Sequence, residues 1–498
     1  MKKYIIPFVL LVALQASCSL DKDPISDYSE KTRSHKDATY TTRAEIKAAY
    51  DAIYTYIKGS GQEYWMLDAL ANFEVRSDNA YAGTTDLPVV SVEQNIQAPD
   101  NTNIARDWRG YLAGIARANM VIANIDGVTD TSLTDSERKQ WKAEAQIFRA
   151  WMYFEMVRMW GNVPLIPAEN IPVITSDNID EIYALLYPEK RNAVSEVYAD
   201  IVANLEEALQ NAPNVNVSNK FLLTKGVANA LLAKVYAEKP IRDYAKTVQY
   251  CDAVIQSGYS LVANYADLFQ LNSGSTDVKL RNSSESIFEI SYQGGGCWVG
   301  GIVGKNYLNA NSTISWRRWV APSRSLMADF DSEGDVIRKE QSIVYEKVNY
   351  ENYYPKDNYP FVYKLRSNAN SVIKLRLADI LLLKAEALVA MGNLNDAAAL
   401  VNQVRARVNL PPLASNVTAS QEAMKAAVLK ERRMELAFEG HRWFDLIRNE
   451  KVIEVMNALN TTDSGRLKMN SMTEQSIIYP IPQTELDKNP KLIQNPGY

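Results

Sequence analysis

KERRMELAFEGHRWFDLIR, at residues 430–448, holds the densest cluster of charged side chains in the chain. The cluster consists of Glu431, Arg432, Arg433, Glu435, Glu439, His441, Arg442 and Asp445. One interpretation is an acid/base site in which a nearby carboxylate tunes His441. Apolar residues such as Leu436, Phe438 and Trp443 alternate with the charges, however. We therefore favour a structural ion-pair network that fixes the last long helix to the rest of the protein.

The long segments before this stretch also have apolar residues at helical spacing. The predicted helices include residues 46–57, 112–122, 147–154, 194–205, 228–235, 244–255, 378–388 and 397–408. Taken two by two they resemble tetratricopeptide units, in which each pair needs a neighbour to cover its apolar face. The sequence thus predicts a mostly α fold: one body of stacked helix pairs, at about 44–258 and 373–448, with a tail at 449–498.

The residues between the two groups of pairs, about 259–372, have a different composition. They are rich in Gly, Ser, Asn and aromatic residues, and SIFEISY (286–292) and FVYKL (361–365) are typical of strands. The run GGGCWVGG (294–301) has too many glycines for a stable helix. We expect a large, irregular, partly β insert, and binding residues often concentrate in such loops on a rigid scaffold.

The first residues are typical of an export signal. Lys2 and Lys3 precede a short apolar core, and small residues end the segment at position 17. The next residue is Cys18, which favours a lipoprotein over a plain secreted protein, because acyl chains on Cys18 would anchor the chain without a membrane span. The expected division is a signal peptide at 1–17 and a mature body at 18–498.

Composition excludes several classes of function. The 498 residues carry a formal net charge of −5, which argues against nucleic acid as a partner. Only 2 His and 3 Cys are present, too few for metal or thiol chemistry, so no cofactor is predicted. Once Cys18 is acylated, Cys251 and Cys297 remain, either as a disulfide or, as we favour, as two thiols. In contrast, 28 Tyr and 9 Trp are available for stacking.

Two acidic patterns suggest other chemistry. DFDSEGD at 329–335 offers carboxylate pairs, which a glycosidase needs, and alternating oxygens like those of a calcium loop. Its acids form one local charge run in a single short segment. A solvated surface segment is therefore the favoured interpretation.

Several motifs appear along the chain in the order found in one known family. They are RSDNA (76–80), AEAQIFRAWMYFEMV (143–157), WGNVP (160–164), LF (268–269), ESIFEI (285–290), LRLADILLLKAEAL (375–388), the stretch at 430–448 and YPIPQTELDKNPKLIQNPGY (479–498). Together they resemble the SusD/RagB family of surface lipoproteins of Bacteroidota. Asp21 and Asp23 also resemble the surface-export signal of those lipoproteins.

The resemblance implies a SusD-like fold and a non-enzymatic function. It implies a glycan-binding subunit at the cell surface, lipid-anchored in the outer membrane through Cys18, which caps a SusC-like TonB-dependent transporter. Such a lid captures an oligosaccharide and delivers it uncleaved. Two alternatives remain open: a RagB-like subunit that captures peptides, and an α-helical glycoside hydrolase.

Aromatic side chains carry the binding hypothesis, because a sugar presents an apolar C–H face that stacks on a ring and hydroxyls that need polar partners. The candidate ligand contacts are Trp298, Trp316 and Trp319 in the insert and Asp78, Asn79 and Tyr81 in the early loop. For Trp316 and Trp319 a buried or transporter-contact role is the alternative. Trp141, Trp151, Trp160 and Trp443 have helical spacing with apolar residues and are predicted to be core.

Overall fold

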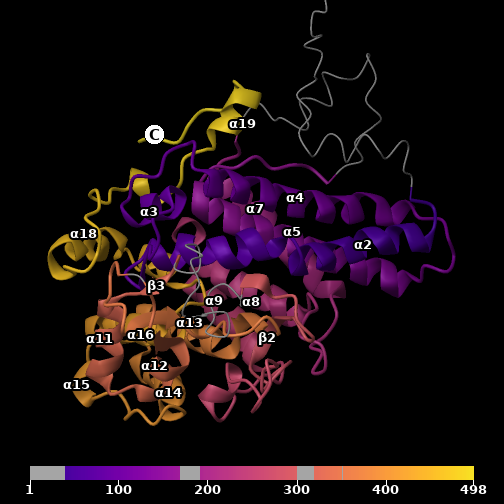
Figure 1. The fold of residues 1–498 in the computed structure, drawn as a ribbon. Helices are drawn as coiled ribbons and strands as arrows, with labels where there is room; N and C mark the ends of the chain where they lie inside the picture. Colours follow the sequence, from indigo (N-terminus) through magenta and orange to yellow (C-terminus); the bar gives the residue numbers. More distant parts are fainter. Residues whose placement is uncertain (1–39, 169–190, 300–318, 350) are drawn as a thin grey trace, which may run out of the picture.

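The first half of the chain forms long antiparallel helices that pack in sequence order. The computed structural model describes residues 40–168, 191–299, 319–349 and 351–498, so Cys18 and Trp316 lie outside the described residues. The helices are α2 (Arg43–Lys58), α4 (Thr102–Asn124), α5 (Asp135–Trp160) and α7 (Val194–Asn211). Each contacts the next, and they form the indigo-to-magenta layer in Figure 1. Capping boxes at Thr42 and Thr134 begin α2 and α5.

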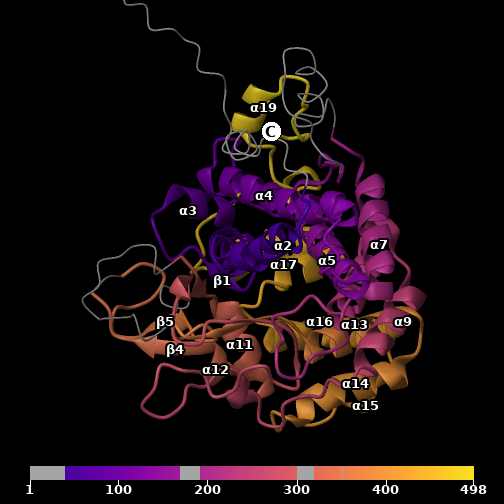
Figure 2. The ribbon, with the colours of Figure 1, turned by 90° about the vertical axis from the view of Figure 1, so that its right-hand side faces the viewer.

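A second layer contains the remaining helix pairs. It consists of α8 (Lys225–Ala237), α9 (Tyr244–Ile255), α13 (Leu377–Ala390), α14 (Leu394–Ala406), α16 (Gln421–Glu435) and α17 (Arg442–Arg448). Helix α9 packs directly on α13 although the insert separates them in sequence. Figure 2 shows α13, α14 and α16 of this layer, in orange, beneath the purple helices. The helices expected from apolar spacing are thus confirmed, and they pack pairwise.

Among the described residues, short antiparallel sheets lie within the insert and at its contacts with the scaffold. Strand β2 (Ser286–Ser291) pairs with β6 (Ser371–Arg376), and β4 (Ile343–Glu346) pairs with β5 (Tyr359–Val362). Strand β1 (Ala80–Tyr81) pairs with β3 (Ala321–Pro322), which brings the early loop to the insert. The insert also contains two helices that the sequence analysis missed, α11 (Arg324–Glu333) and α12 (Val336–Ser342).

The predicted tail is partly helical as well. Helices α18 (Val452–Thr462) and α19 (Gln483–Lys488) lie within it. Near the start of the chain, α3 (Leu87–Glu93) follows two π-helical turns, η1 (Gln62–Asp68) and η2 (Ala71–Val75). These turns connect α2 to the early loop, which contains Asp78, Asn79 and Tyr81, and η1 carries Gln62 and Asp68.

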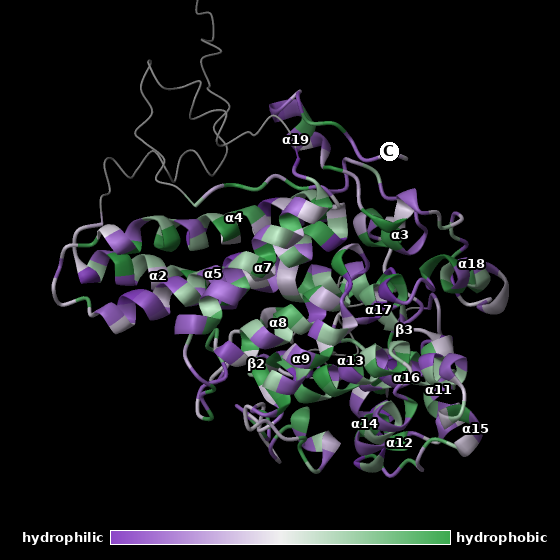
Figure 3. Ribbon diagram, turned by 180° about the vertical axis from the view of Figure 1, so that it is seen from behind, coloured by the Kyte–Doolittle hydropathy of each residue, from purple (hydrophilic) through white to green (hydrophobic). Residues whose placement is uncertain are grey.

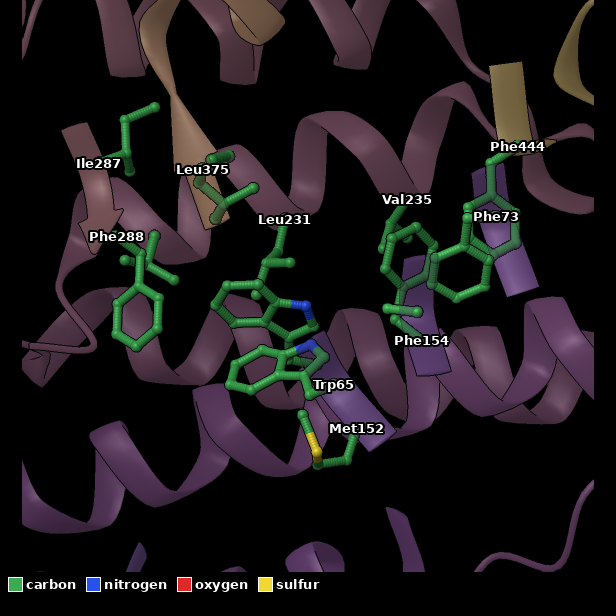
Figure 4. Close-up of a cluster of buried hydrophobic side chains, with 14 of the residues drawn as sticks. Trp65, Phe73, Met152, Phe154, Leu231, Val235, Ile287, Phe288, Leu375 and Phe444 are labelled. Atoms are coloured by element: carbon green, nitrogen blue, oxygen red, sulfur yellow. The ribbon is translucent and has the colours of Figure 1, made fainter. Parts of the chain in front are cut away.

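One apolar core runs through both layers, from Ile46 to Ile481. Figure 4 shows Trp65, Met152, Leu231 and Phe288 meeting where the layers join. Trp141, Trp151, Trp160 and Trp443 are all buried, as predicted. Purple and green alternate around the outer helices in Figure 3, because one face of each meets water. Among the described residues, no helix is both long and apolar enough to cross a bilayer.

Candidate functional site

Trp298 lies at the surface, where the glycine-rich loop at 293–297 enters a helical turn that begins at Trp298, contrary to the expectation of no helix in this run. Its ring is 38% exposed, and its backbone N–H donates to Gln62 Oε1 at 3.0 Å. The amide of Gln62 donates in turn to the carbonyls of Lys58 and Gly296, each at 3.0 Å. Gly294, Gly295 and Gly296 have φ of 83°, 111° and 100°, a region that residues with a Cβ seldom adopt. The loop is therefore held against the end of α2 and the start of η1 with an aromatic ring facing outward.

The surroundings of Trp298 combine aromatic and polar groups. The Tyr292 hydroxyl donates to the Lys58 carbonyl at 3.0 Å, and Lys58 Nζ lies 5.5 Å from the Tyr292 ring centroid. The backbone N–H of Cys297 donates to the Asn368 carbonyl at 2.8 Å, which ties the loop to the segment before β6. An exposed ring on a rigid loop with a polar border can stack on a sugar face while its neighbours bind hydroxyls.

Trp319 is only partly exposed. Its ring packs against the apolar core, and its indole N–H donates to Asp86 Oδ2 at 2.7 Å, just before α3. Its polar edge is therefore already bonded, and at most part of the ring is available to a ligand. In the sequence, Trp298 and Trp319 flank residues 300–318, which include Trp316.

Asp78 and Asn79 are buried, contrary to what ligand contact requires. Asp78 is 4% exposed and forms ion pairs with Arg442 at 2.7 Å and Arg433 at 3.1 Å. Asn79 is 1% exposed; its amide donates to Glu74 at 2.7 Å and accepts from Arg433 at 2.9 Å. Because their polar atoms are bonded within the protein, we assign both a structural role and remove them from the proposed ligand contacts.

Tyr81 is buried too. Its hydroxyl donates to Asp463 at 2.7 Å, and its ring stacks on Tyr353 with centroids 4.8 Å apart. It belongs to a small aromatic core formed with Ala321, Val348, Tyr354, Tyr359 and Phe361. We therefore assign Tyr81 a structural role as well, in joining the early loop to the insert.

Gln62 is a candidate positioning residue that the sequence analysis missed. The sequence GSG at 59–61 marks the end of the preceding helix, but Gly296, its partner, lies 234 residues further along the chain. Asp86, the partner of Trp319, was missed for the same reason. Only a pattern linking distant residues would have indicated either one.

The charged residues of the 430–448 stretch form a buried ion-pair network, which confirms the structural interpretation. Arg376 bridges Glu285 at 2.9 Å, Glu439 at 2.7 Å and Glu435. Arg338 binds Glu431 at 2.6 Å and Glu435 at 3.1 Å. The network thereby joins the insert, β6 and α16 in the interior, where each buried charge needs its partners.

His441 is part of this network rather than an exposed acid or base. Burial, together with the nearby Lys234 ammonium, lowers the pKa of His441 to about 3. Its Nδ1 lies 3.2 Å from Lys234 Nζ, and Lys234 also binds Asp379 at 2.7 Å. The imidazole is therefore neutral at pH 7 and accepts a hydrogen bond from the lysine.

The acidic run at 329–335 lies in α11 and its C-terminal turn, and its carboxylates are bound to cations of the protein. Asp329 pairs with Arg433, and Asp335 pairs with Arg338. Glu333 binds Lys430 at 2.7 Å and Arg405 at 3.1 Å. Over the described ranges, no group of three or more His, Cys, Asp or Glu side chains is placed to hold a metal ion.

A pocket in the described part of the chain is too small for a sugar. It has a volume of about 40 Å³, room for two or three water molecules. Its lining includes Met66, Phe269, Lys364, Lys374 and Phe438.

The network predicts loss of stability in acid. Burial opposes ionisation of Glu439, but Arg376 and Lys364 override it and lower the pKa of Glu439 to about 2. The pKa of Glu435 is lowered as well, by Arg407 and Arg376 against the effect of burial. Their stabilisation is complete above the unfolded value of about 4.3 and is lost as pH falls through the folded value.

Glu439 alone should stabilise the fold by about 3 kcal/mol at pH 6, a contribution that disappears by pH 2. Urea unfolding at pH 6, 4 and 3 measures this loss. The difference between wild type and Glu439→Gln should shrink as the pH falls. A difference that stays constant down to pH 3 would mean that Glu439 is not held ionised by its partners.

Comparison with known proteins finds family models and relatives that match this chain. A family model described as "SusD family" matches residues 304–498, and one described as "Starch-binding associating with outer membrane" matches residues 20–237. The SusD-like proteins P38 and P2 of Formosa agariphila are 27% and 25% identical over 547 and 543 residues, covering 100% of this chain and 99% and 100% of theirs.

A solved structure shows the same fold. Surface glycan-binding protein A of Bacteroides thetaiotaomicron, in complex with laminarihexaose, has a TM-score of 0.73 at 21% identity, over 91% of this chain and 100% of that one. The two family models match both halves of the chain, and the motifs at 143–164 and 430–498 fall within them. The chain is therefore a SusD-like protein, a member of the SusD family.

Proposed function

We propose that this protein is a glycan-binding lipoprotein of the outer membrane surface, which captures an oligosaccharide and passes it to a SusC-like TonB-dependent transporter. The observation that carries the proposal is Trp298, an exposed ring on a loop fixed by Gln62 and three glycines with positive φ. The family description names starch binding, and a structural neighbour was solved with laminarihexaose.

The chemistry of the surface supports capture without cleavage. The ring of Trp298 is a stacking platform, and the exposed Lys58 and Gln293 beside it offer donors and an acceptor for sugar hydroxyls. The carboxylates of the acidic run and of the 430–448 stretch are tied to arginine and lysine side chains. A SusD-like protein of this kind binds its ligand and is not an enzyme.

The membrane attachment belongs to the same proposal. Residues 1–17 would be removed as a signal peptide, and acyl chains on Cys18 would hold the body at 18–498 on the outer membrane. Trp316 stays a proposed ligand or transporter contact. Trp319 is proposed to offer the exposed part of its ring to the same ligand. A peptide ligand, as in a RagB-like subunit, is the alternative that the following experiment also examines.

Trp298→Ala should weaken glycan binding by about 1–3 kcal/mol, roughly 5- to 150-fold, because a large apolar contact is lost. Calorimetry with starch-derived and laminarin-derived oligosaccharides measures the affinity, and a melting curve checks the fold. Tyr345→Ala is the matched control, since Tyr345 is 40% exposed and lies on β4.

The control variant should bind normally. Equal affinity of wild type and Trp298→Ala, or a melting point lowered by many degrees, would assign Trp298 a structural role. Binding of short peptides in place of every glycan tested would favour the RagB-like alternative.

A further inference from the structure

Two aspartates face each other in the interior beneath the π-helical turns. Asp68 ends η1 and is 1% exposed, and Asp107 of α4 is 0% exposed. Asp68 forms an ion pair with Arg106 at 2.6 Å. Asp107 Oδ2 accepts from the Asn72 amide at 2.7 Å, while its Oδ1 has no hydrogen-bond donor among the described groups.

A proton on Asp107 Oδ1 would explain why this oxygen has no hydrogen-bond donor. An ionised carboxylate is an acceptor only, so two of them in contact repel each other and leave a buried acceptor unsatisfied. A proton on Oδ1 turns Asp107 into a donor toward Asp68, satisfies that oxygen and removes one buried charge. Burial and the neighbouring Asp68 raise the pKa of Asp107 well above its usual value, and burial raises the pKa of Asp68 to about 6.

The other charged groups around the pair do not offer Asp107 a counterion of its own. Arg106 already binds Asp68 and also Glu63, at 2.8 Å. Arg76 lies against the Tyr479 ring, 3.9 Å from its centroid. The titratable or charged groups that act on the pair directly are Glu63, Arg106, Tyr111 and Tyr479. Around them, Glu155 and Arg158 neighbour Tyr111, and Arg76 and Tyr498 neighbour Tyr479.

We propose that Asp107 carries a proton at neutral pH and donates it to Asp68, so that the pair is a proton-dependent clamp on the segment that holds the Trp298 loop. Gln62, at the other end of η1, binds the Trp298 backbone. Asn72, the partner of Asp107, accepts from the Tyr479 hydroxyl at 2.8 Å and so connects the clamp to the C-terminal tail. Ionisation of Asp107 would loosen both contacts. The effect on ligand capture rests on the proposed function, whereas the shared proton does not.

Because the pKa values of Asp68 and Asp107 are raised in the folded protein, the pair stabilises the fold less as pH rises. In the unfolded chain both aspartates are ionised above about pH 5. Above pH 6 the folded pair retains one proton that the unfolded chain lacks, so its stabilisation is lost as pH rises. The folding equilibrium constant should fall tenfold for each pH unit, about 1.4 kcal/mol.

Asp107→Asn is the decisive variant, because asparagine keeps a donor toward Asp68 and an acceptor for Asn72 but cannot ionise. Urea unfolding should show the wild-type folding constant falling about 100-fold relative to this variant between pH 6 and 8. Other titrating groups, such as Glu74, cancel in the comparison. Asp126→Asn, at an aspartate whose side chain is 58% exposed, is the control and should follow wild type.

Two further measurements use the same proteins. Infrared spectra of wild type labelled with ¹³C-aspartate should show a protonated carboxyl at pH 7 that Asp107→Asn lacks. At pH 8, hydrogen exchange at residues 62–75 and 293–298 should be faster in wild type than in the variant. The proposal would be overturned if the ratio of the wild-type folding constant to that of Asp107→Asn did not change with pH and no protonated aspartate were seen at pH 7. If the variant fails to fold, the infrared titration of wild type decides alone.

Discussion

Arg376→Ala should lower the free energy of unfolding by about 3–5 kcal/mol, because it removes a cationic partner from buried carboxylates. Arg376 is 1% exposed, and its guanidinium reaches Glu285, Glu435 and Glu439 at once. Without it, Glu435 would still face Arg338 and Arg407, whereas Glu439 would keep Lys364 as its one cation among the described residues. Urea unfolding at pH 7 measures the change.

Two variants make this result specific. Arg376→Lys keeps the charge but loses the forked geometry, so its stability should lie between those of wild type and Arg376→Ala. Lys347→Ala removes an ion pair whose two side chains are 76% and 64% exposed, and it should change stability by less than about 1 kcal/mol. A loss from Arg376→Ala as small as that of Lys347→Ala would contradict a stabilising role for the network.

Trp151→Ala should cost about 3–5 kcal/mol of stability, since it leaves a cavity where the two helical layers meet. Trp151 is 2% exposed and lies edge-on to Trp65 and Phe288, with ring centroids 4.7 and 5.3 Å away. Figure 4 shows these two partners, which come from η1 and β2. Denaturant unfolding measures the loss.

The same substitution at Trp298 is the matched control, because it deletes an equal volume from an exposed position. Trp298→Ala should keep most of the stability and lose affinity, whereas Trp151→Ala should lose stability and bind normally where it is folded. A stability loss below about 1 kcal/mol at Trp151 would show that its neighbours collapse into the space.

The helical scaffold could be predicted because apolar periodicity is a local property. The spacing at 147–154 and 378–388 indicated α5 and α13, and both lie where expected. The missed helices α11 and α12 are short, with ten and seven residues, and carry many charges, so each offers little apolar periodicity to recognise. The strand at 286–291 was recognised from its run of Ile and Phe.

The candidate site could be predicted only in part. Trp298 was chosen for its glycine-rich surroundings, and its ring is exposed. Asp78 and Asn79 have the same polar character that a sugar contact needs. Their burial depends on Arg442 and Arg433, which lie 364 and 354 residues away in sequence.

The sequence by itself determined the helices and the family motifs, because each is a pattern within a short window. Only the tertiary structure decided which polar residues are accessible and which are partners. Ion pairs such as Arg376 with Glu435, and the facing carboxyls of Asp68 and Asp107, arise when distant helices meet. The free energy of a charge depends on the water and partners around it, and no local pattern encodes those surroundings.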